Sequence, residues 1–253
     1  MRDFLFALRS GFGFLTTIPV GISMEGIEKL MKHIYLFPVV GAVLGLLLAG
    51  IAYASSFVLP PILISVILVI SIYYLTGFNH IDGLADFGDG VAAHGAREKK
   101  MAAMRDTHVG TGGLIVCMIA ILGLFASLFS IAETNKMLLP FALIAAETCA
   151  KQSMVTIAAF GKRLHEGFGA MTVENTKKSD FIIGMYFSGA VCFLSLGTYG
   201  IVALFVSQFA ALLVLNSANR HFGGVSGDIV GATNEVGRLA ALMFIGGYTW
   251  MQL

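Results

Sequence analysis

The chain has 253 residues, of which 57% are apolar and 12% are charged, and its mean hydropathy is +0.85. Such values exclude an ordinary water-soluble domain and predict an integral membrane protein. Sixteen basic and fifteen acidic residues leave a net charge of +1. This balance is too even to attract a polyanion along an extended surface, so we expect no nucleic-acid partner.

The first 33 residues begin with a basic, apolar stretch that Arg9 interrupts. No small-residue cleavage pattern follows this stretch, so it is not typical of a removed signal peptide. We therefore predict an N-terminal helix that lies at the membrane interface or is partly inserted.

Seven apolar runs follow this segment. A helix needs about 20 mostly apolar residues to cross the hydrocarbon core, and lipid-facing backbone must satisfy its own hydrogen bonds. The sequence therefore predicts an all-α, polytopic membrane protein with about seven transmembrane helices and a single membrane-embedded domain over residues 1–253. The predicted spans are residues 34–59, 60–78, 113–132, 138–160, 181–197, 198–218 and 235–253.

Basic residues are confined almost entirely to alternate polar segments. Apart from Lys136 and Lys151, every Lys and Arg lies in or just beyond residues 1–33, 79–112, 161–180 and 219–234. The positive-inside rule places these segments and the N-terminus in the cytoplasm, which predicts a multi-pass protein of the cytoplasmic (inner) membrane. All six histidines lie in the same segments. We therefore expect the active site on the cytoplasmic face, in catalytic loops 79–112, 161–180 and 219–234.

An acidic cluster follows the second predicted span, in the sequence HIDGLADFGDG at residues 80–90. If this segment is helical, Asp82, Asp86 and Asp89 share one face because they are spaced i, i+4 and i+7. Like charges at this spacing repel, and carboxylate oxygens are ligands that Mg²⁺ prefers. We interpret the three residues as ligands of a divalent cation; the alternative is a solvated acidic loop.

The same polar segment ends in RDTHVGTGG, residues 105–113. Arg105 offers a guanidinium fork for phosphate, and Asp106 adds a carboxylate. Backbone N–H groups at the start of a helix favour anions, so this run suits a pyrophosphate. The alternative is that the glycines only form the loop that precedes a helix. The expected backbone contacts are Gly110, Thr111, Gly112 and Gly113.

The last polar segment, residues 219–234, leads into the seventh predicted span. Asp228 and Glu235 are seven residues apart, which places them on one helical face where a second acidic ridge would complete the metal site. A helix cap with a solvated acidic pair is the alternative. The substrate contacts expected here are Asn219, Arg220, Gly224 and Asp228.

Two further patterns lie within predicted spans. Glu147 and Lys151 are spaced i and i+4 in the fourth span, and they form either a structural ion pair or a wall of the substrate cavity. In the second case Lys151 binds substrate. Gly41 and Gly45 form a small-residue pattern that allows helices to pack closely, which leaves a homo-oligomer possible.

Five motifs occur in order along the chain: FGFLTTIPV, HIDGLADFGDG, RDTHVGTGG, EGFGAMT and GGVSGDIVGATNEVG. Together they resemble the cobalamin synthase family, also called the adenosylcobinamide-GDP ribazoletransferases. The similarity spans most of the chain, and the specific signal is the ordered set of motifs.

This resemblance implies a Mg²⁺-dependent membrane enzyme of cobalamin (vitamin B12) biosynthesis. Such an enzyme joins adenosylcobinamide-GDP to α-ribazole or α-ribazole 5′-phosphate, forms adenosylcobalamin or its 5′-phosphate, and releases GMP. The residues agree with this chemistry, because an alcohol attacks a pyrophosphate and a metal ion with Arg105 would stabilise the charge that develops.

The resemblance also suggests roles for the candidate residues. The expected metal ligands are Asp82, Asp86, Asp89, Asp106, Asp228 and Glu235. The expected catalytic residues are His80, Asp82, Asp89 and Arg105, with Asp89 and His80 left as alternatives for the general base. Asn79 is expected to contact substrate.

Two other functions are weighed against this one. The segment at Asp82 opens like the DG-x-x-AR signature of CDP-alcohol phosphotransferases, but Asp86 replaces the Arg and the next Asp comes too early, at Asp89. The second alternative is a transporter for cations or a corrinoid. Transporter ion sites lie near the bilayer midplane, where this sequence offers only Glu147 and Lys151.

Overall fold

The computed structural model describes residues 2–164 and 167–251, and its regular elements there are all helices. A single isolated β-bridge, between Arg163 and Val225, is present in the same residues. The fold class predicted from the sequence is thereby confirmed. The helices are α1 (Arg2–Leu15), α2 (Met24–Met31), η1 (Ile34–Leu36), α3 (Phe37–Ser56), α4 (Pro61–Thr76), α5 (Asn79–Ala92), α6 (Arg97–Met104), α7 (Thr111–Asn135), η2 (Lys136–Leu138), α8 (Leu139–Phe160), α9 (Phe168–Asn175), α10 (Lys178–Leu196), α11 (Thr198–His221) and α12 (Gly227–Trp250).

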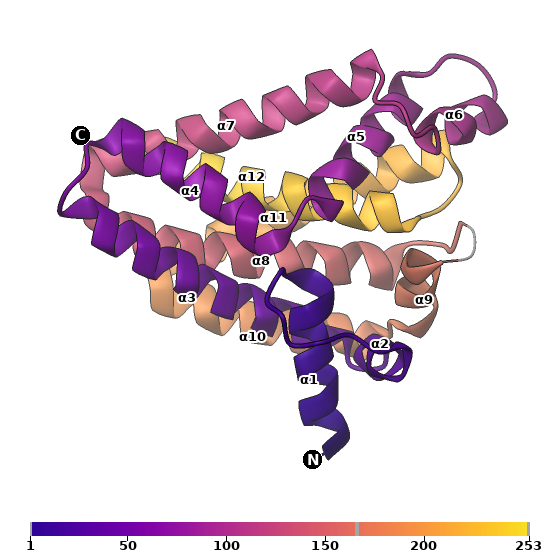
Figure 1. The fold of residues 1–253 in the computed structure, drawn as a ribbon, viewed down its shortest axis with the longest axis horizontal. Coiled ribbons are helices and arrows are strands. Elements are labelled where there is room, and N and C mark those ends of the chain that lie inside the picture. The colour runs from indigo at the N-terminus through magenta and orange to yellow at the C-terminus, as the bar shows by residue number, and fades with distance from the viewer. Residues whose placement is uncertain (1, 165–166, 252–253) are drawn as a thin grey trace.

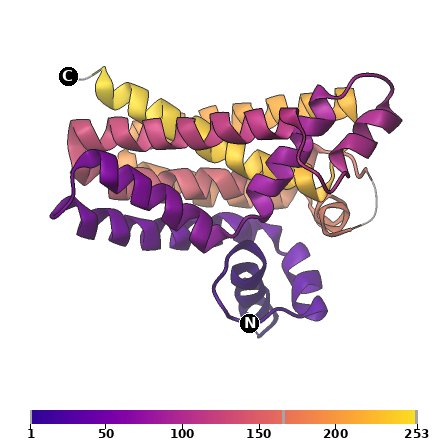
Figure 2. The same ribbon diagram turned by 45° about the horizontal axis from the view of Figure 1, so that its top comes forward.

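The long helices form a bundle around α8 and α12 (Figures 1 and 2). Helices α3, α10 and α11 pack on α8, whereas α5, α7 and α11 pack on α12. The short helices α5, α6 and α9 gather at one end of the bundle, and the C-terminal end of α12 lies at the other (Figure 1). The polar segments that the sequence singles out are therefore close together at a single end.

Each of the seven predicted spans coincides with a helix. Fewer helices qualify as membrane spans, however, when each must be both long enough and apolar enough to cross a membrane. Five stretches qualify, one of them the 50-residue run Thr111–Phe160 that contains both α7 and α8, and a sixth qualifies if α4 and α5 count together. By this criterion the described residues hold five to six candidate spans, compared with about seven predicted. The reason is that α4 has only 16 residues and α8 follows α7 with only the short η2 turn between them.

The predicted catalytic loops are largely helical. Helices α5 and α6 occupy most of residues 79–112, α9 lies within 161–180, and α11 and α12 extend into 219–234. Residues 165 and 166 of the second loop and the last two residues of the seventh predicted span lie outside the described residues. The predicted N-terminal helix is present as α1, and α2 follows it; in Figure 2 both lie beside the bundle.

A sharp bend separates α4 from α5. Gly77 ends α4 with a φ of +69°, a conformation that side-chain-bearing residues rarely adopt, and the two helix axes differ by 94°. A helix turned this far does not continue the same crossing, so we treat α5 as lying outside the membrane-spanning segments. The bend places the acidic segment across the end of the bundle.

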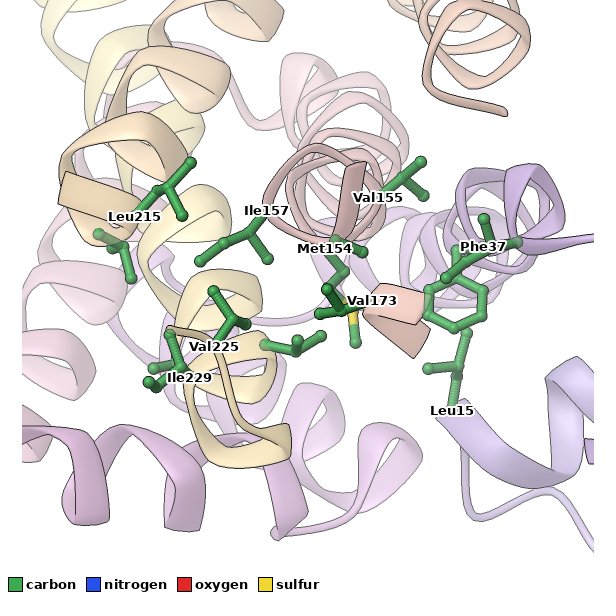
Figure 3. Packing of buried hydrophobic residues seen from close by; sticks show 14 of the residues in the cluster. Leu15, Phe37, Met154, Val155, Ile157, Val173, Leu215, Val225 and Ile229 are labelled. Carbon is green, nitrogen blue, oxygen red and sulfur yellow. The ribbon is translucent and has the colours of Figure 1, made fainter. Parts of the chain in front are cut away.

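The core consists of two apolar clusters, one of which joins the end that carries α9 to the rest of the bundle. Figure 3 shows its members Phe37, Met154 and Val173, which come from α3, α8 and α9. Leu15 of α1 belongs to the same cluster, so the N-terminal helix is anchored to the bundle by buried apolar contact.

Helices α3 and α8 approach closely at the predicted small-residue pattern. A Cβ atom added at Gly41 would lie 2.5 Å from the carbonyl oxygen of Glu147, and one added at Gly45 would lie 2.5 Å from the Cα of Ile144. The pattern therefore packs two helices of the same chain, as small residues do in membrane bundles.

We expect Gly45→Ala to destabilise the bundle by about 1–3 kcal/mol, because the added methyl group forces α3 away from the α8 backbone. Thermal unfolding in detergent measures the effect. Gly50→Ala is the matched control on the same helix, since a Cβ there meets no atom within 4 Å. Equal stability of the two variants would contradict the close-packing argument.

Candidate active site

The two acidic segments meet where α5 crosses the start of α12. A Cβ atom added at Gly83 would lie 2.6 Å from the carbonyl oxygen of Asp228, and one added at Gly231 would lie 3.3 Å from the Cα of His80. The absence of side chains at both glycines allows the backbones to touch. This contact brings Asp228 to the acidic helix.

Asp86 lies at the centre of the acidic cluster formed by these two helices. It is half-buried, and burial together with three nearby carboxylates raises its pKa to about 6. The three carboxylates, in decreasing order of effect, belong to Asp82, Asp228 and Asp89. We call Asp82, Asp86 and Asp228 the carboxylate cluster; its mutual repulsion is a cost that a bound cation would relieve.

Asp89 joins α5 to the start of α7. Its Oδ2 accepts a hydrogen bond from the N–H of Gly110 at 2.7 Å, and its Oδ1 accepts one from the N–H of Gly113 at 2.8 Å. A Cβ atom at either glycine would lie within 2.6 Å of the carboxylate, which explains why glycine occupies both positions. The carboxylate of Asp89 thus takes the place at the start of α7 where a diphosphate was expected to bind.

This pairing corrects one sequence interpretation. The N–H groups of Gly110 and Gly113 are already used, so the expected pyrophosphate contact reduces to Thr111 and Gly112. Each oxygen of Asp89 accepts one hydrogen bond and keeps a second lone pair, so its roles as metal ligand and general base stay predictions.

Arg105 and Asp106 lie in the exposed turn between α6 and α7. Asp106 accepts hydrogen bonds from the backbone N–H of His108 at 3.0 Å and from its ring Nδ1 at 2.9 Å. These bonds hold the pKa of Asp106 below its usual value. Arg105 is exposed to solvent and able to turn toward an anionic ligand.

The turn between α11 and α12 carries the remaining predicted contacts. Asn219 and Arg220 are exposed at the end of α11, and the backbone oxygen of Asn219 accepts a hydrogen bond from Arg97 at 3.4 Å. Gly224 is buried and packs closely on the neighbouring backbone. A Cβ atom added there would lie 2.7 Å from the carbonyl oxygen of Lys162. Its role in this structure is to let the turn pack on the segment after α8.

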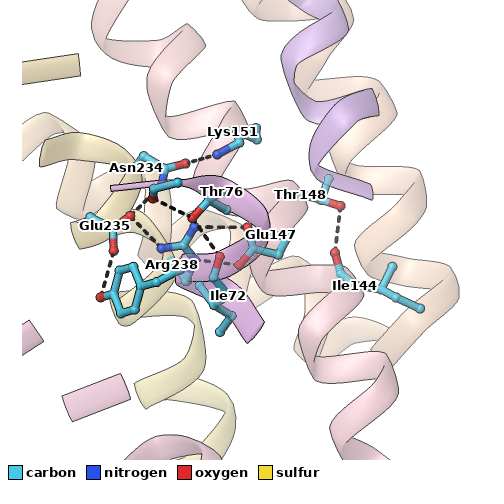
Figure 4. A network of polar contacts seen from close by, with 11 residues as sticks. Ile72, Thr76, Ile144, Glu147, Thr148, Lys151, Asn234, Glu235 and Arg238 are labelled. Atoms are coloured by element: carbon cyan, nitrogen blue, oxygen red, sulfur yellow. Dashed lines mark hydrogen bonds and ion pairs between the residues drawn. The ribbon is translucent and has the colours of Figure 1, made fainter. Parts of the chain in front are cut away.

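A buried ion network lies deeper in the bundle (Figure 4). Arg238 of α12 is 1% exposed, and its Nε and Nη2 lie 2.5 and 3.2 Å from the carboxylate of Glu147 on α8. Its Nη1 donates to Glu235 at 2.6 Å. The guanidinium is therefore neutralised by two carboxylates from two helices.

Two residues that were expected in the active site belong to this buried network. Glu235, an expected metal ligand, also accepts hydrogen bonds from Asn234 at 2.9 Å and Tyr73 at 3.3 Å, so both its oxygens are occupied. Lys151 donates to Asn234 at 2.6 Å and is fully buried. Of the two roles left open for Glu147 and Lys151, an ion pair with each other is not found in the described residues, where each has its own partner on α12; the role as a cavity wall stays a prediction.

Sequence reasoning missed Arg238 and Tyr73 as members of this network. Arg238 was assigned to the edge of a cytoplasmic segment, although its i, i+3 spacing from Glu235 was a signal for an intrahelical pair. Tyr73 carries no comparable signal, because its hydroxyl meets Glu235 only after α4 and α12 pack together.

His80 and Asn79 occupy the first turn of α5 and differ in their exposure to solvent. Asn79 is exposed, whereas His80 is 6% exposed and burial holds its pKa well below the usual histidine value. A neutral, buried His80 does not share the exposed environment of Asp82. The choice between Asp89 and His80 as the general base stays open.

The carboxylate cluster satisfies the chemistry of a Mg²⁺ site only in part. Mg²⁺ takes hard oxygen ligands, keeps several waters, and is usually held by one or two carboxylates together with substrate phosphates. Within residues 2–164 and 167–251, no group of three or more His, Cys, Asp or Glu side chains is arranged so that it could hold a metal ion. The carboxylate cluster would therefore need substrate oxygens and water to complete the coordination of an ion.

The fold and the site together define a polytopic helical membrane protein with a carboxylate cluster at one end. The family profile of cobalamin-5-phosphate synthase matches residues 7–246. Curated proteins named adenosylcobinamide-GDP ribazoletransferase are also similar to the chain. The relative from Methanosarcina barkeri is 44% identical over the whole of both chains, and that from Methanosarcina mazei is 45% identical over 97% of this chain and 93% of its own.

A more distant relative of the same name, from Archaeoglobus fulgidus, is 30% identical over 90% of this chain. No solved structure matches the chain significantly. The chain belongs to the cobalamin-5-phosphate synthase family. It is accordingly a transferase of cobalamin synthesis, and the alternatives of a phospholipid enzyme and a transporter are set aside.

The raised pKa of Asp86 predicts how stability depends on pH. Between its ordinary value of 3.8 and about 6, the folded state holds a proton that the unfolded state has released. Stability should therefore fall as pH rises through this window, in buffer without divalent cations. We expect Asp86→Asn to flatten the dependence of the melting temperature, with Glu98→Gln on α6 as control. An unchanged slope in Asp86→Asn would show that the repulsion is absent.

The ion network predicts a large loss of stability when one partner is removed. Glu147→Gln leaves the buried charge of Arg238 with a single carboxylate, so we expect a loss of about 3–5 kcal/mol in unfolding free energy. Denaturation in detergent measures it. The control is Glu133→Gln, an exposed carboxylate at the far end of α7, which should have little effect.

Proposed function

We propose that this chain transfers the adenosylcobinamide-phosphate group from adenosylcobinamide-GDP to α-ribazole or α-ribazole 5′-phosphate. The products are adenosylcobalamin or its 5′-phosphate, and GMP. The observation that carries the proposal is the meeting of α5 and α12, which gathers the carboxylate cluster at one end of a bundle whose curated relatives bear this enzyme's name.

In the proposed reaction an acceptor hydroxyl oxygen forms a bond to the phosphorus attached to the cobinamide. The bond from that phosphorus to the bridging oxygen breaks, GMP leaves with the electron pair, and the hydroxyl proton passes to a basic group or solvent. Charge accumulates on the oxygens of the diphosphate, so the protein must supply positive charge and exact orientation there.

We propose Mg²⁺ as the cofactor, held by Asp82, Asp86 and Asp228. When bound, it would neutralise the diphosphate oxygens and orient them. The support for this is the chemistry of the donor set, since three carboxylates repel one another without a cationic partner on the same side. Arg105, exposed in the neighbouring turn, would bind the phosphate of the leaving GMP through its guanidinium fork.

We further propose that this end of the bundle faces the cytoplasm, with the N-terminus on the same side, in the inner membrane. The support is the distribution of Lys and Arg, because the segments that join the helices at this end carry nearly all of them. The bend after α4 and the crossing of α5 over α12 would open the site to nucleotide-linked substrates from that side.

GMP release from adenosylcobinamide-GDP tests the proposal. With purified protein in liposomes, release should require both α-ribazole and Mg²⁺, and Asp82→Asn should lower it by at least about 100-fold if Asp82 binds the ion that stabilises the transition state. Glu25→Gln, an exposed carboxylate on α2, is the matched control.

The same assay reports the side of the membrane, because the donor is polar and does not cross a sealed vesicle. Inverted membrane vesicles should turn over added donor and right-side-out vesicles should not. Release that is independent of acceptor and metal, from folded protein, would exclude the transfer reaction; turnover only in right-side-out vesicles would exclude the orientation.

A further inference from the structure

A small cavity lies beside the carboxylate cluster but is lined by none of its three members. It measures about 110 Å³ and forms where α1, α3, α5, α8, α9 and α12 meet. The cavity and the cluster share two helices. His80 precedes Gly83 on α5, and Gly231 follows Asp228 on α12, in each case by three residues. The cavity therefore lies about one helical turn, or roughly 5 Å, from the α5–α12 crossing at the cluster.

The polar residues that line this cavity are Asn79, His80 and Thr172, and His80 is the one with a buried, unpaired polar atom. His80 lines the space, it is 94% buried, and its ring Nδ1 has no hydrogen-bond partner within the described parts of the chain. Buried polar atoms in native proteins are nearly always paired, so an unpaired nitrogen at a cavity wall indicates a partner that enters from outside.

Apart from these polar residues, the lining is apolar side chains and glycine backbone. Phe37 and Met154 contribute an aromatic ring and a thioether, and both belong to the apolar cluster drawn in Figure 3. Gly227 and Gly231 expose backbone without a side chain on the α12 side. Such walls suit a planar aromatic group, which packs on rings and sulfur and approaches backbone closely.

The volume of the cavity further limits which ligands it can hold. A volume of about 110 Å³ exceeds the roughly 10–15 Å³ that a cavity needs to hold one water, and it is well below the roughly 300–1,000 Å³ of pockets for whole drug-sized ligands. The space is therefore too small for a corrin ring or a complete nucleotide. It is suited to a single small ring system that carries one nitrogen able to pair with His80.

We propose that this cavity binds the aromatic nitrogen heterocycle of the acceptor alcohol, with the Nδ1–H of His80 donating to the unsubstituted ring nitrogen of that base. This inference rests on the proposed function, because it names the part of the site that holds the acceptor. The ribose attached to the base would then extend along the α5–α12 crossing toward the carboxylate cluster. His80 is thus a residue that selects the acceptor.

The first test separates acceptor binding from chemistry by steady-state kinetics of GMP release. We expect His80→Leu to raise the KM for α-ribazole by about tenfold or more, with little change in the KM for adenosylcobinamide-GDP. His80→Asn, whose amide nitrogen can donate from nearly the same place, should restore much of the affinity. His94→Leu, an exposed histidine after α5, is the control.

The second test uses benzimidazole as a probe in equilibrium dialysis with the purified full chain and needs no donor. Saturable binding to the wild type that His80→Leu loses supports the proposal, even if the wild type releases no GMP and the proposed function fails. Met154→Trp, which fills the cavity and keeps His80, should also abolish binding; it replaces His80→Leu if that variant does not fold.

Two results would overturn the proposal. One is a fall in kcat for His80→Leu with an unchanged KM for α-ribazole, which would make the residue structural. The other is benzimidazole binding that is absent from the wild type or identical in the wild type, His80→Leu and Met154→Trp. The cavity would then be a void that water fills.

Discussion

The arrangement of the bundle depends on the ion pairs that the buried guanidinium of Arg238 makes. A charge in the interior of a membrane bundle is tolerated only with close partners, and here Glu147 and Glu235 supply them. Apolar helix contacts permit sliding and rotation at small cost, whereas a two-carboxylate clamp does not. The clamp sets the position of α12 along α8, and therefore where Asp228 lies at the start of α12.

Helix α5 is positioned from two sides once α12 is in place. Its backbone touches α12 at Gly83, and Asp89 binds the first N–H groups of α7. Both contacts need glycine, because a side chain would occupy the space of a carbonyl oxygen or a carboxylate. The acidic face is thus held by packing and hydrogen bonds, and not by pairing of its own charges.

The two kinds of acidic residue in this protein differ in what surrounds them. Glu147 and Glu235 are compensated inside the bundle, so they stabilise the fold and are closed to ligands. Asp82, Asp86 and Asp228 are mutually repulsive at the end of the bundle. A site that leaves repulsion unrelieved is where a metal ion or an oriented cationic partner gains most on binding, which is the physical basis for placing the chemistry there.

The sequence by itself determined the membrane class, the seven helical segments, the i, i+4, i+7 acidic face and the family, because hydrophobic length, helical periodicity and ordered motifs are local properties of the chain. It did not determine which charges pair. Glu235 and Asp228 look alike on one helical face, yet only tertiary packing brings Arg238, Asn234 and Tyr73 to the first and α5 to the second. The tertiary structure likewise decided that Asp89, and not a diphosphate, occupies the N–H groups of Gly110 and Gly113, since that contact joins residues more than 20 positions apart.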